Sequence, residues 1–239
     1  MESVLVAATV FSLLSIGQSA PLTSCESLIQ PLEIQGRDQL LGKWMLVAES
    51  ANIQDVEVKI NSFRESQWLK ISAANESDAV IFTNTVKLFG FCVTLINKMT
   101  LENNALQPSI INETSEHPPP PEGVFKLSPI NLLKTGCRDC LLLRRAQHLG
   151  LGLVLLSKRR TVTDAELEEF KKQGECLDLP WTFSPNPEGG LCPEPPPEET
   201  DVMHFLVNGQ RSDFLKVIET IVNSTGEPSS FFETASELS

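Results

Sequence analysis

The sequence predicts an all-β protein in which eight antiparallel strands form a barrel and one later helix packs on it. Two observations lead to this fold class. Between Trp44 and Leu156 the chain is a series of short runs rich in Val, Ile, Leu and Phe, separated by polar or proline-containing breaks. This pattern is typical of antiparallel strands rather than of helices. After Arg160 the pattern changes to that of a capped helix.

The apolar runs define where the strands are expected. They lie at about 43–50, 57–73, 77–87, 91–101, 105–111, 123–133, 139–145 and 150–157, and the second is expected to bend near Arg64–Gln67. An up-and-down sheet of this size closes readily into a barrel, which removes exposed edges and leaves an interior able to hold one small ligand. A two-sheet sandwich fits the same pattern and stays open as the structural alternative.

The helix is expected at 163–174. Thr163-Asp-Ala-Glu166 has the form of a capping box, in which the hydroxyl and the carboxylate each satisfy an amide at the helix start. Leu167 and Phe170 fall three residues apart on one face, and Gly174 can end the helix. That apolar face is therefore expected to dock on the barrel.

The two ends of the chain differ from this central domain. Residues 1–20 have an apolar core followed by small residues, as in a secretory signal peptide. The domain is then expected over 21–195, and 196–239 form an acidic tail. Within the tail a short amphipathic helix is predicted from five apolar positions: Phe214, Val217, Ile218, Ile221 and Val222. Such a helix is too short to be stable alone, so it needs a surface or a partner.

Cysteines and glycosylation motifs agree with a secreted, extracellular protein. The cysteines are even in number, and an oxidising compartment would join them in one of fifteen possible sets of pairs. They are Cys25, Cys92, Cys137, Cys140, Cys176 and Cys192. Asn75, Asn112 and Asn223 each begin an Asn-x-Ser/Thr motif, which predicts three N-linked glycans on exposed loops.

Charge and motifs exclude several classes of function. A net charge of −12 disfavours nucleic acids and anionic membranes as partners, and no segment after residue 20 is long and apolar enough for a membrane span. The sequence lacks the common nucleophile, phosphate-binding and zinc-protease motifs. Cys137-Arg-Asp-Cys140 has no second pair of zinc ligands. We therefore expect a binding and transport protein, or an inhibitor acting through its surface and tail, with no catalytic residues, metal or cofactor.

Gly42-Lys43-Trp44 at the start of the first strand, Arg159-Arg160 after the last one and the capped helix together resemble the layout of the lipocalins. In that family the Trp plugs the closed end of the barrel and an Arg from the last strand packs across it. The resemblance implies that Gly42 and Trp44 form the barrel floor, with Arg160 or Arg159 stacked on the indole.

Three further stretches narrow the resemblance. Residues 25–44, 75–82 and 168–180 are similar to alpha-1-acid glycoprotein, to apolipoprotein M and most of all to the fish plasma lipocalins that bind saxitoxin and tetrodotoxin. This likeness implies three disulfides, Cys25–Cys176, Cys92–Cys192 and Cys137–Cys140. The chain departs from the family at its second motif, which here reads KTGCRDC at 134–140, and it contains no tyrosine.

The ligand site is expected inside the barrel. The alternation set by Trp44 sends Leu46 and Ala48 toward the interior, and similarity to the family adds Phe82, Leu142, Val154 and Leu156, which could equally be plain core. This aliphatic lining favours a small lipophilic ligand.

A guanidinium toxin, the alternative ligand, would need a carboxylate at the open mouth. Glu49, Asp55 and Glu57 are the candidates, unless they are solvated loop acids. Loop order places Asn112 and Pro118–Pro121 at that mouth and Asn75 near the closed end.

Overall fold

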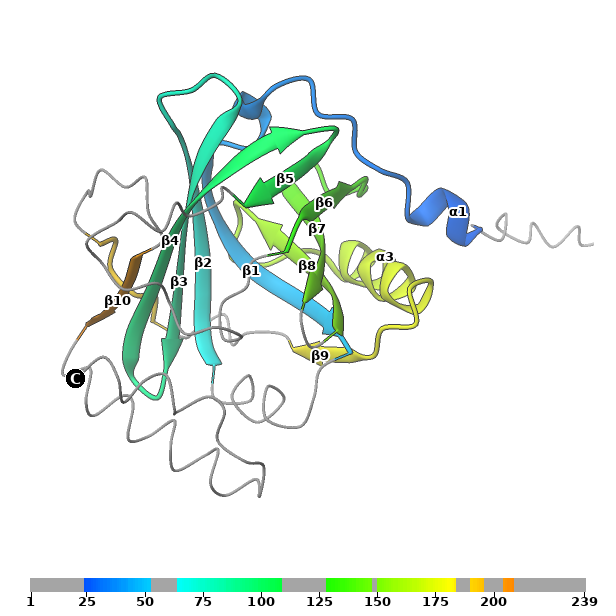
Figure 1. Cartoon of the computed structure of the whole chain (residues 1–239). Helices are drawn as coiled ribbons and strands as arrows, with labels where there is room; N and C mark the ends of the chain where they lie inside the picture. Colours follow the sequence, from blue (N-terminus) through cyan, green and yellow to red (C-terminus); the bar gives the residue numbers. More distant parts are fainter. Residues whose placement is uncertain are drawn as a thin grey trace, which may run out of the picture.

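The computed structural model describes residues 24–52, 64–108, 128–147, 150–183, 190–195 and 204–208. Eight antiparallel strands form a closed up-and-down barrel (Figure 1). They are β1 (Gly42–Ala51), β2 (Arg64–Ala73), β3 (Ala79–Leu88), β4 (Phe91–Glu102), β5 (Ala105–Pro108), β6 (Ile130–Leu133), β7 (Cys140–Gln147) and β8 (Gly150–Ser157). Each strand pairs with the next along the chain, and β1 pairs with β8. The predicted barrel is confirmed, and the sandwich alternative is wrong because the strands make one closed sheet.

The predicted strands match the observed ones closely where the structure describes them. Parts of the expected second, fifth and sixth strands, at 57–63, 109–111 and 123–127, lie outside the described residues. The bend expected near Arg64–Gln67 is present as a shift in register between Arg64 and Ser66. Two strands were not predicted: β9 (Trp181–Phe183) pairs with β1, and β10 (His204–Asn208), within the segment assigned to the tail, pairs with β4. The apolar positions at 214–222 lie outside the described residues.

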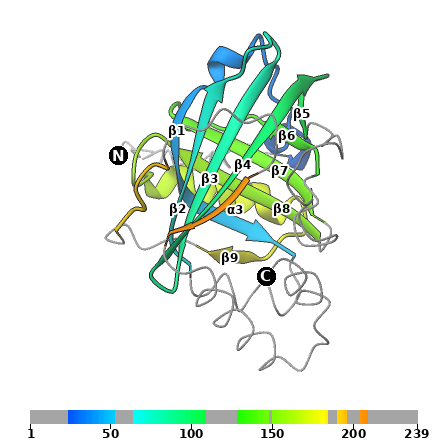
Figure 2. The same cartoon turned by 60° about the vertical axis from the view of Figure 1, so that its left-hand side comes forward.

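The predicted helix is present as α3 (Asp164–Glu175). The Thr163 amide donates to the Glu166 carboxylate at 2.7 Å, and the Glu166 amide donates to the Thr163 hydroxyl at 3.3 Å. Both halves of the capping box are therefore formed. Phe170 is buried against the barrel, and Figure 2 shows α3 lying along the outside of the β7–β8 wall.

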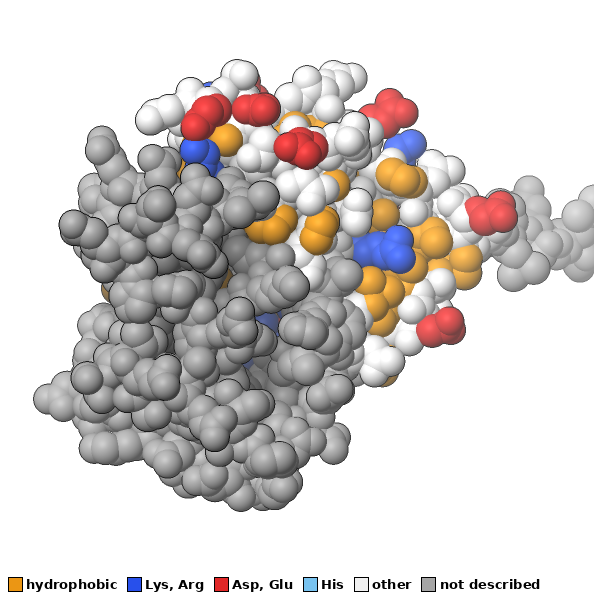
Figure 3. All heavy atoms as spheres, viewed as in Figure 1, with side chains coloured by type: hydrophobic (Ala, Val, Ile, Leu, Met, Phe, Trp, Pro, Cys, Tyr) orange, Lys and Arg blue, Asp and Glu red, His pale blue; other side chains and the backbone are white. Residues whose placement is uncertain are grey.

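Buried side chains form two clusters, one on each side of the barrel wall. The first lies inside the barrel. The second lies between the wall and α3, and includes Val47, Ala48, Leu142 and Phe170. Figure 3 shows hydrophobic side chains gathered on the flank that carries α1 (Cys25–Leu28) and α3. The wall is thus apolar on both faces where the helix covers it.

The closed end of the barrel is tied down by the segment before β1, which includes the 3-10 turn η1 (Arg37–Gln39). The Arg37 guanidinium donates to the carbonyls of Ala74 and Ala79 at 2.9 Å each, and also to that of Glu76. These three carbonyls belong to the turn between β2 and β3, and the same turn carries Asn75, which is exposed. Asn75 therefore lies near the closed end, as expected, whereas Asn112, Asn223 and Pro118–Pro121 lie outside the described residues.

Three disulfides are present, and all three expected pairs are confirmed. Cys25–Cys176 joins α1 to the end of α3, Cys92–Cys192 joins β4 to the C-terminal segment, and Cys137–Cys140 lies between β6 and β7. The first two close loops with sequence separations of 151 and 100 residues. In the chain-entropy model each of these contributes about 5 kcal/mol by restricting the unfolded chain.

Candidate functional site

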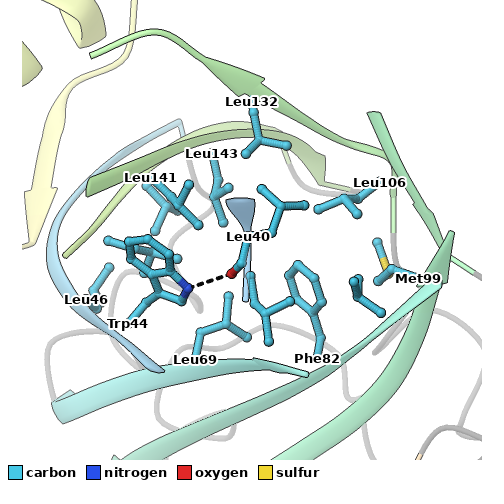
Figure 4. Close-up of a cluster of buried hydrophobic side chains, with 14 residues drawn as sticks. Leu40, Trp44, Leu46, Leu69, Phe82, Met99, Leu106, Leu132, Leu141 and Leu143 are labelled. Carbon is cyan, nitrogen blue, oxygen red and sulfur yellow. Dashed lines mark hydrogen bonds between the residues drawn. The ribbon is translucent and has the colours of Figure 1, made fainter. Parts of the chain in front are cut away.

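The barrel interior is lined by an apolar cluster with Trp44 at its base. The Trp44 indole nitrogen donates to the carbonyl of Leu40 at 2.9 Å, so the ring is buried with its polar atom satisfied (Figure 4). Around it the cluster contains Leu40, Leu46, Leu69, Ile71, Val80, Phe82, Met99, Leu106, Leu132, Leu141, Leu143, Val154 and Leu156. Trp44, the third residue of β1, thus lies buried in the interior cluster, and its role as the plug of the barrel floor stays a prediction.

The basic residue over Trp44 is not the one that was expected. The Lys158 ammonium lies 4.8 Å from the centre of the Trp44 ring, whereas Arg159 donates to Glu166 at 2.7 Å and Arg160 is exposed. The prediction of an arginine partner is therefore wrong. β8 ends at Ser157, opposite Met45, so the next residue is the one that reaches Trp44. Gly42 has φ +130°, a conformation that favours glycine, and the Lys158 Cε lies at an ordinary van der Waals distance, 3.7 Å, from where a Cβ on Gly42 would lie.

Four of the six residues predicted to line the cavity lie in the interior cluster: Leu46, Phe82, Val154 and Leu156. Their contact with a ligand remains a prediction. Ala48 and Leu142 belong instead to the cluster beneath α3, so their predicted inward orientation is wrong. Leu142 opposes Leu155 and alternates with its inward-facing neighbours Leu141 and Leu143.

Ala48 is displaced by a β-bulge in β1. Leu46 opposes Leu156 and Ala48 opposes Leu155, which leaves Val47 as one extra residue in β1. A bulge of this kind reverses the alternation of side chains beyond it. Val47 and Ala48 therefore both pack in the outer cluster. Glu49 opposes the inward-facing Val154, so it also faces the interior of the barrel.

Glu49 is a buried carboxylate between two arginines. Its side chain is 2% exposed and accepts hydrogen bonds from Arg64, which is 6% exposed, and from Arg145 at 2.5 Å, which is 32% exposed. Burial raises the pKa of Glu49, but attraction to Arg145 and Arg64, with the hydrogen bonds they donate, outweighs it, so the pKa lies below the usual 4.5. The carboxylate is thus ionised at neutral pH inside the barrel.

The bulge in β2 turns Arg64 toward Glu49. Arg64 opposes Leu88 and Ser66 opposes Lys87, so Glu65 is the extra residue. If Glu65 were paired like its neighbours, so that β2 had no bulge, alternation from the inward-facing Leu69 would send Arg64 to the outer face. Two bulges in neighbouring strands therefore place the opposite charges of one ion pair inside the barrel, and Arg145 joins them by plain alternation from Leu143.

Amide side chains continue this polar region across the wall. The Arg64 guanidinium donates to the Gln67 carbonyl oxygen at 2.6 Å, and the Gln67 amide donates to Asn84 at 2.8 Å. Asn84 opposes the inward-facing Leu69. The described interior is thus apolar near Trp44 and polar at the other end of β1 and β2.

The expected carboxylate for a guanidinium ligand is already engaged. The expectation that Glu49 is a solvated loop acid is wrong, because its carboxylate is buried and accepts hydrogen bonds from two guanidinium groups. A guanidinium ligand would have to displace them. Asp55 and Glu57 lie outside the described residues.

Other site types are tested only where the structure describes the chain. There, no three His, Cys, Asp or Glu side chains are grouped to hold a metal ion. The helices in the same residues are all too short or too polar to cross a bilayer.

No protein-family model and no curated protein matches the chain. Solved structures similar to it include the siderocalin Ex-FABP, described as functioning through dual ligand specificities, at 13% identity and a TM-score of 0.48; the match covers 62% of this chain and 95% of that one. Another siderocalin, described as having a dual ligand binding mode, is 15% identical with a TM-score of 0.48, covering 66% of this chain and 96% of its own. Similarity at this level says nothing about a ligand.

Proposed function

We propose that this protein is a secreted lipocalin of the plasma type that binds a small lipophilic molecule inside its barrel, carries it, and catalyses no reaction. The observation that carries the proposal is the two-part interior, apolar around Trp44 and Phe82 and polar around Glu49. The Gly42-Lys43-Trp44 floor, the capped helix after the barrel and the three disulfides support the family. The disulfides also favour an oxidising compartment.

The polarity of the interior suggests how the ligand lies. Its apolar part would rest on the cluster above Trp44, where burying about 300 Å² contributes roughly 7 kcal/mol before the costs of association. A polar group at its other end would lie near Arg145 and Gln67, since charged and amide side chains occur there. An amphipathic lipophile therefore fits better than a wholly apolar one.

Tryptophan fluorescence can test this, because the tryptophans are differently placed. Trp44 is inside the barrel, whereas the Trp68 indole donates to the Cys192 carbonyl on the outer wall. In the mature full chain carrying Trp68→Phe and Trp181→Phe, Trp44 is the only reporter. We expect quenching by cis-parinaric acid at micromolar concentrations, and none by tetrodotoxin.

The matched control carries Trp44→Phe and keeps the other two tryptophans. It should bind the same probe, measured by the probe's own fluorescence, with a much smaller protein signal. A response to tetrodotoxin alone would favour the toxin-binding alternative. No change in Trp44 fluorescence with either compound would contradict binding of a ligand in the barrel. It would favour an inhibitor that acts through its surface and tail.

A further inference from the structure

One edge of β4 is covered by two segments that are far apart in the sequence. β3 pairs with β4 from Phe91 to Thr100 on one side. On the other side, β5 pairs only with Met99–Glu102, and β10 pairs with Cys92–Ile96 (Figure 1). The C-terminal segment thus pairs with the part of this edge, Cys92–Ile96, that β5 does not reach.

β4 changes its partner from β5 to β10 where β5 ends. Pro108, its last residue, opposes Met99 and has no N–H to donate. His204 of β10 opposes Ile96, and Asn208 opposes Cys92. Within the described residues, β10 is therefore the strand that completes the barrel wall beside this half of β4.

Among the strands that the structure describes, β10 pairs with β4 alone. It stands at the end of the described strand order, whereas β1 to β8 each lie between two neighbours. Five residues of β10 lie opposite residues of β4, whereas ten residues of β3 do. Local opening begins where the fewest contacts are broken, so β10 is easier to detach than β3.

The segment before β10 is fixed to the outer wall. Cys192 is bonded to Cys92, its carbonyl accepts from the Trp68 indole at 3.0 Å, and Glu194 pairs with Lys70 at 2.6 Å. A chain that detaches at His204 is thus still tethered at Cys192, twelve residues earlier (204 − 192). Such a tether gives a high effective concentration, so β10 returns to its own β4 rather than to another copy.

The part of β4 that pairs with β10 borders the polar part of the interior. Leu95 and Val93 alternate with the inward-facing Met99, and Leu95 opposes Asn84, which accepts from Gln67. We propose that β10 is a displaceable wall strand, and that the ligand enters and leaves the barrel beside β4 when β10 detaches. The ligand route rests on the proposed function, whereas the detachment does not.

Locking β10 to β4 tests the route. Ile96→Cys with His204→Cys places two cysteines at directly opposed positions, whose Cα separation in a sheet suits a disulfide. Stopped-flow fluorescence with cis-parinaric acid then gives the association and dissociation rates for the full chain. In the locked protein we expect both rates to fall at least tenfold, with the dissociation constant within twofold of the wild-type value. The single variants are the matched controls, and a locked protein with their rates would overturn the route.

Hydrogen exchange without ligand tests the detachment. We expect the amides of Cys92–Ile96 that face β10 to exchange faster in the wild-type protein than in the locked one. Equal exchange in both, or exchange of β10 between copies to give a dimer detected by light scattering, would overturn the displaceable strand. If no probe binds while the lock still slows exchange, the proposed function and the ligand route fail, but the strand remains displaceable.

Discussion

Glu49 is ionised inside the barrel because two guanidinium groups hold it there. Removing one member of a buried ion pair costs more than the pair contributes, since the remaining charges lose their partner. Arg64 and Arg145 would then face one another without the carboxylate between them. The stability of the barrel wall near β1 and β2 should therefore depend strongly on this one side chain.

The variant Glu49→Gln keeps the shape of the side chain and removes its charge. We expect a loss of about 3 kcal/mol in the free energy of unfolding, at the lower end for a buried pair because Arg145 is partly exposed. Urea denaturation measures this. Glu65→Gln, which breaks the partly exposed pair with Lys87, is the matched control and should cost less than about 1 kcal/mol. Equal losses in the two variants would contradict the role of Glu49.

The lowered pKa of Glu49 predicts how stability depends on pH. Because the pKa is lower in the folded than in the unfolded protein, the contribution is complete above the usual value of 4.5 and is lost as the pH falls through the folded value. The difference in unfolding free energy between the wild-type protein and Glu49→Gln should therefore shrink in acid below that pH. Urea titrations from pH 7 to 3 check this, and a constant difference would show that Glu49 does not titrate as argued.

The sequence predicts the interior position of Trp44 and of four of the six candidate lining residues, but neither the lysine over Trp44 nor the ion pair. Trp44 and Leu46 precede the first bulge, so plain alternation describes them correctly. Ala48 and Glu49 follow it, and their orientations are therefore reversed. Val47 is an ordinary strand residue, so nothing in the local sequence marks it as the extra one.

At the scale of elements, α3 was predictable because its start is encoded locally. Thr163 and Glu166 satisfy each other's amides whatever surrounds them. β10 could not be predicted in the same way, because it pairs with the part of β4 that β5 does not reach and follows a segment bonded to Cys92. Both conditions involve residues far away in the sequence.

The variant Thr163→Ala removes one half of the capping box. We expect a loss of about 1 kcal/mol in the free energy of unfolding, because the Glu166 amide loses its acceptor. Thermal unfolding followed by circular dichroism measures this. Thr161→Ala, at an exposed position just before the helix, is the control and should leave the melting temperature nearly unchanged. An equal fall in the melting temperature of Thr161→Ala would contradict a specific role for the capping box.

For the whole molecule, the disulfides restrict the unfolded chain to very different degrees. Cys92–Cys192 has a sequence separation of 100, whereas that of Cys137–Cys140 is 3. Replacing both cysteines of a pair by serine should cost about 5 kcal/mol for the first pair and about 2 kcal/mol for the second. Denaturation of the two double variants under identical conditions measures the difference. A larger loss for the short loop would mean that packing beneath α3 outweighs the entropy of the unfolded chain.

The bulges in β1 and β2 make the chemistry of the interior depend on strand register as well as on residue identity. If β1 paired with β8 without its bulge, Ala48 would oppose Val154 and face inward, and Glu49 would face outward, with the sequence unchanged. Deleting Val47 would instead leave both side chains as they are, because Leu46, Ala48 and Glu49 already alternate without it. A slip of one residue between β1 and β8 would therefore exchange a charged interior wall for an apolar one, and with it the kind of molecule that fits the barrel.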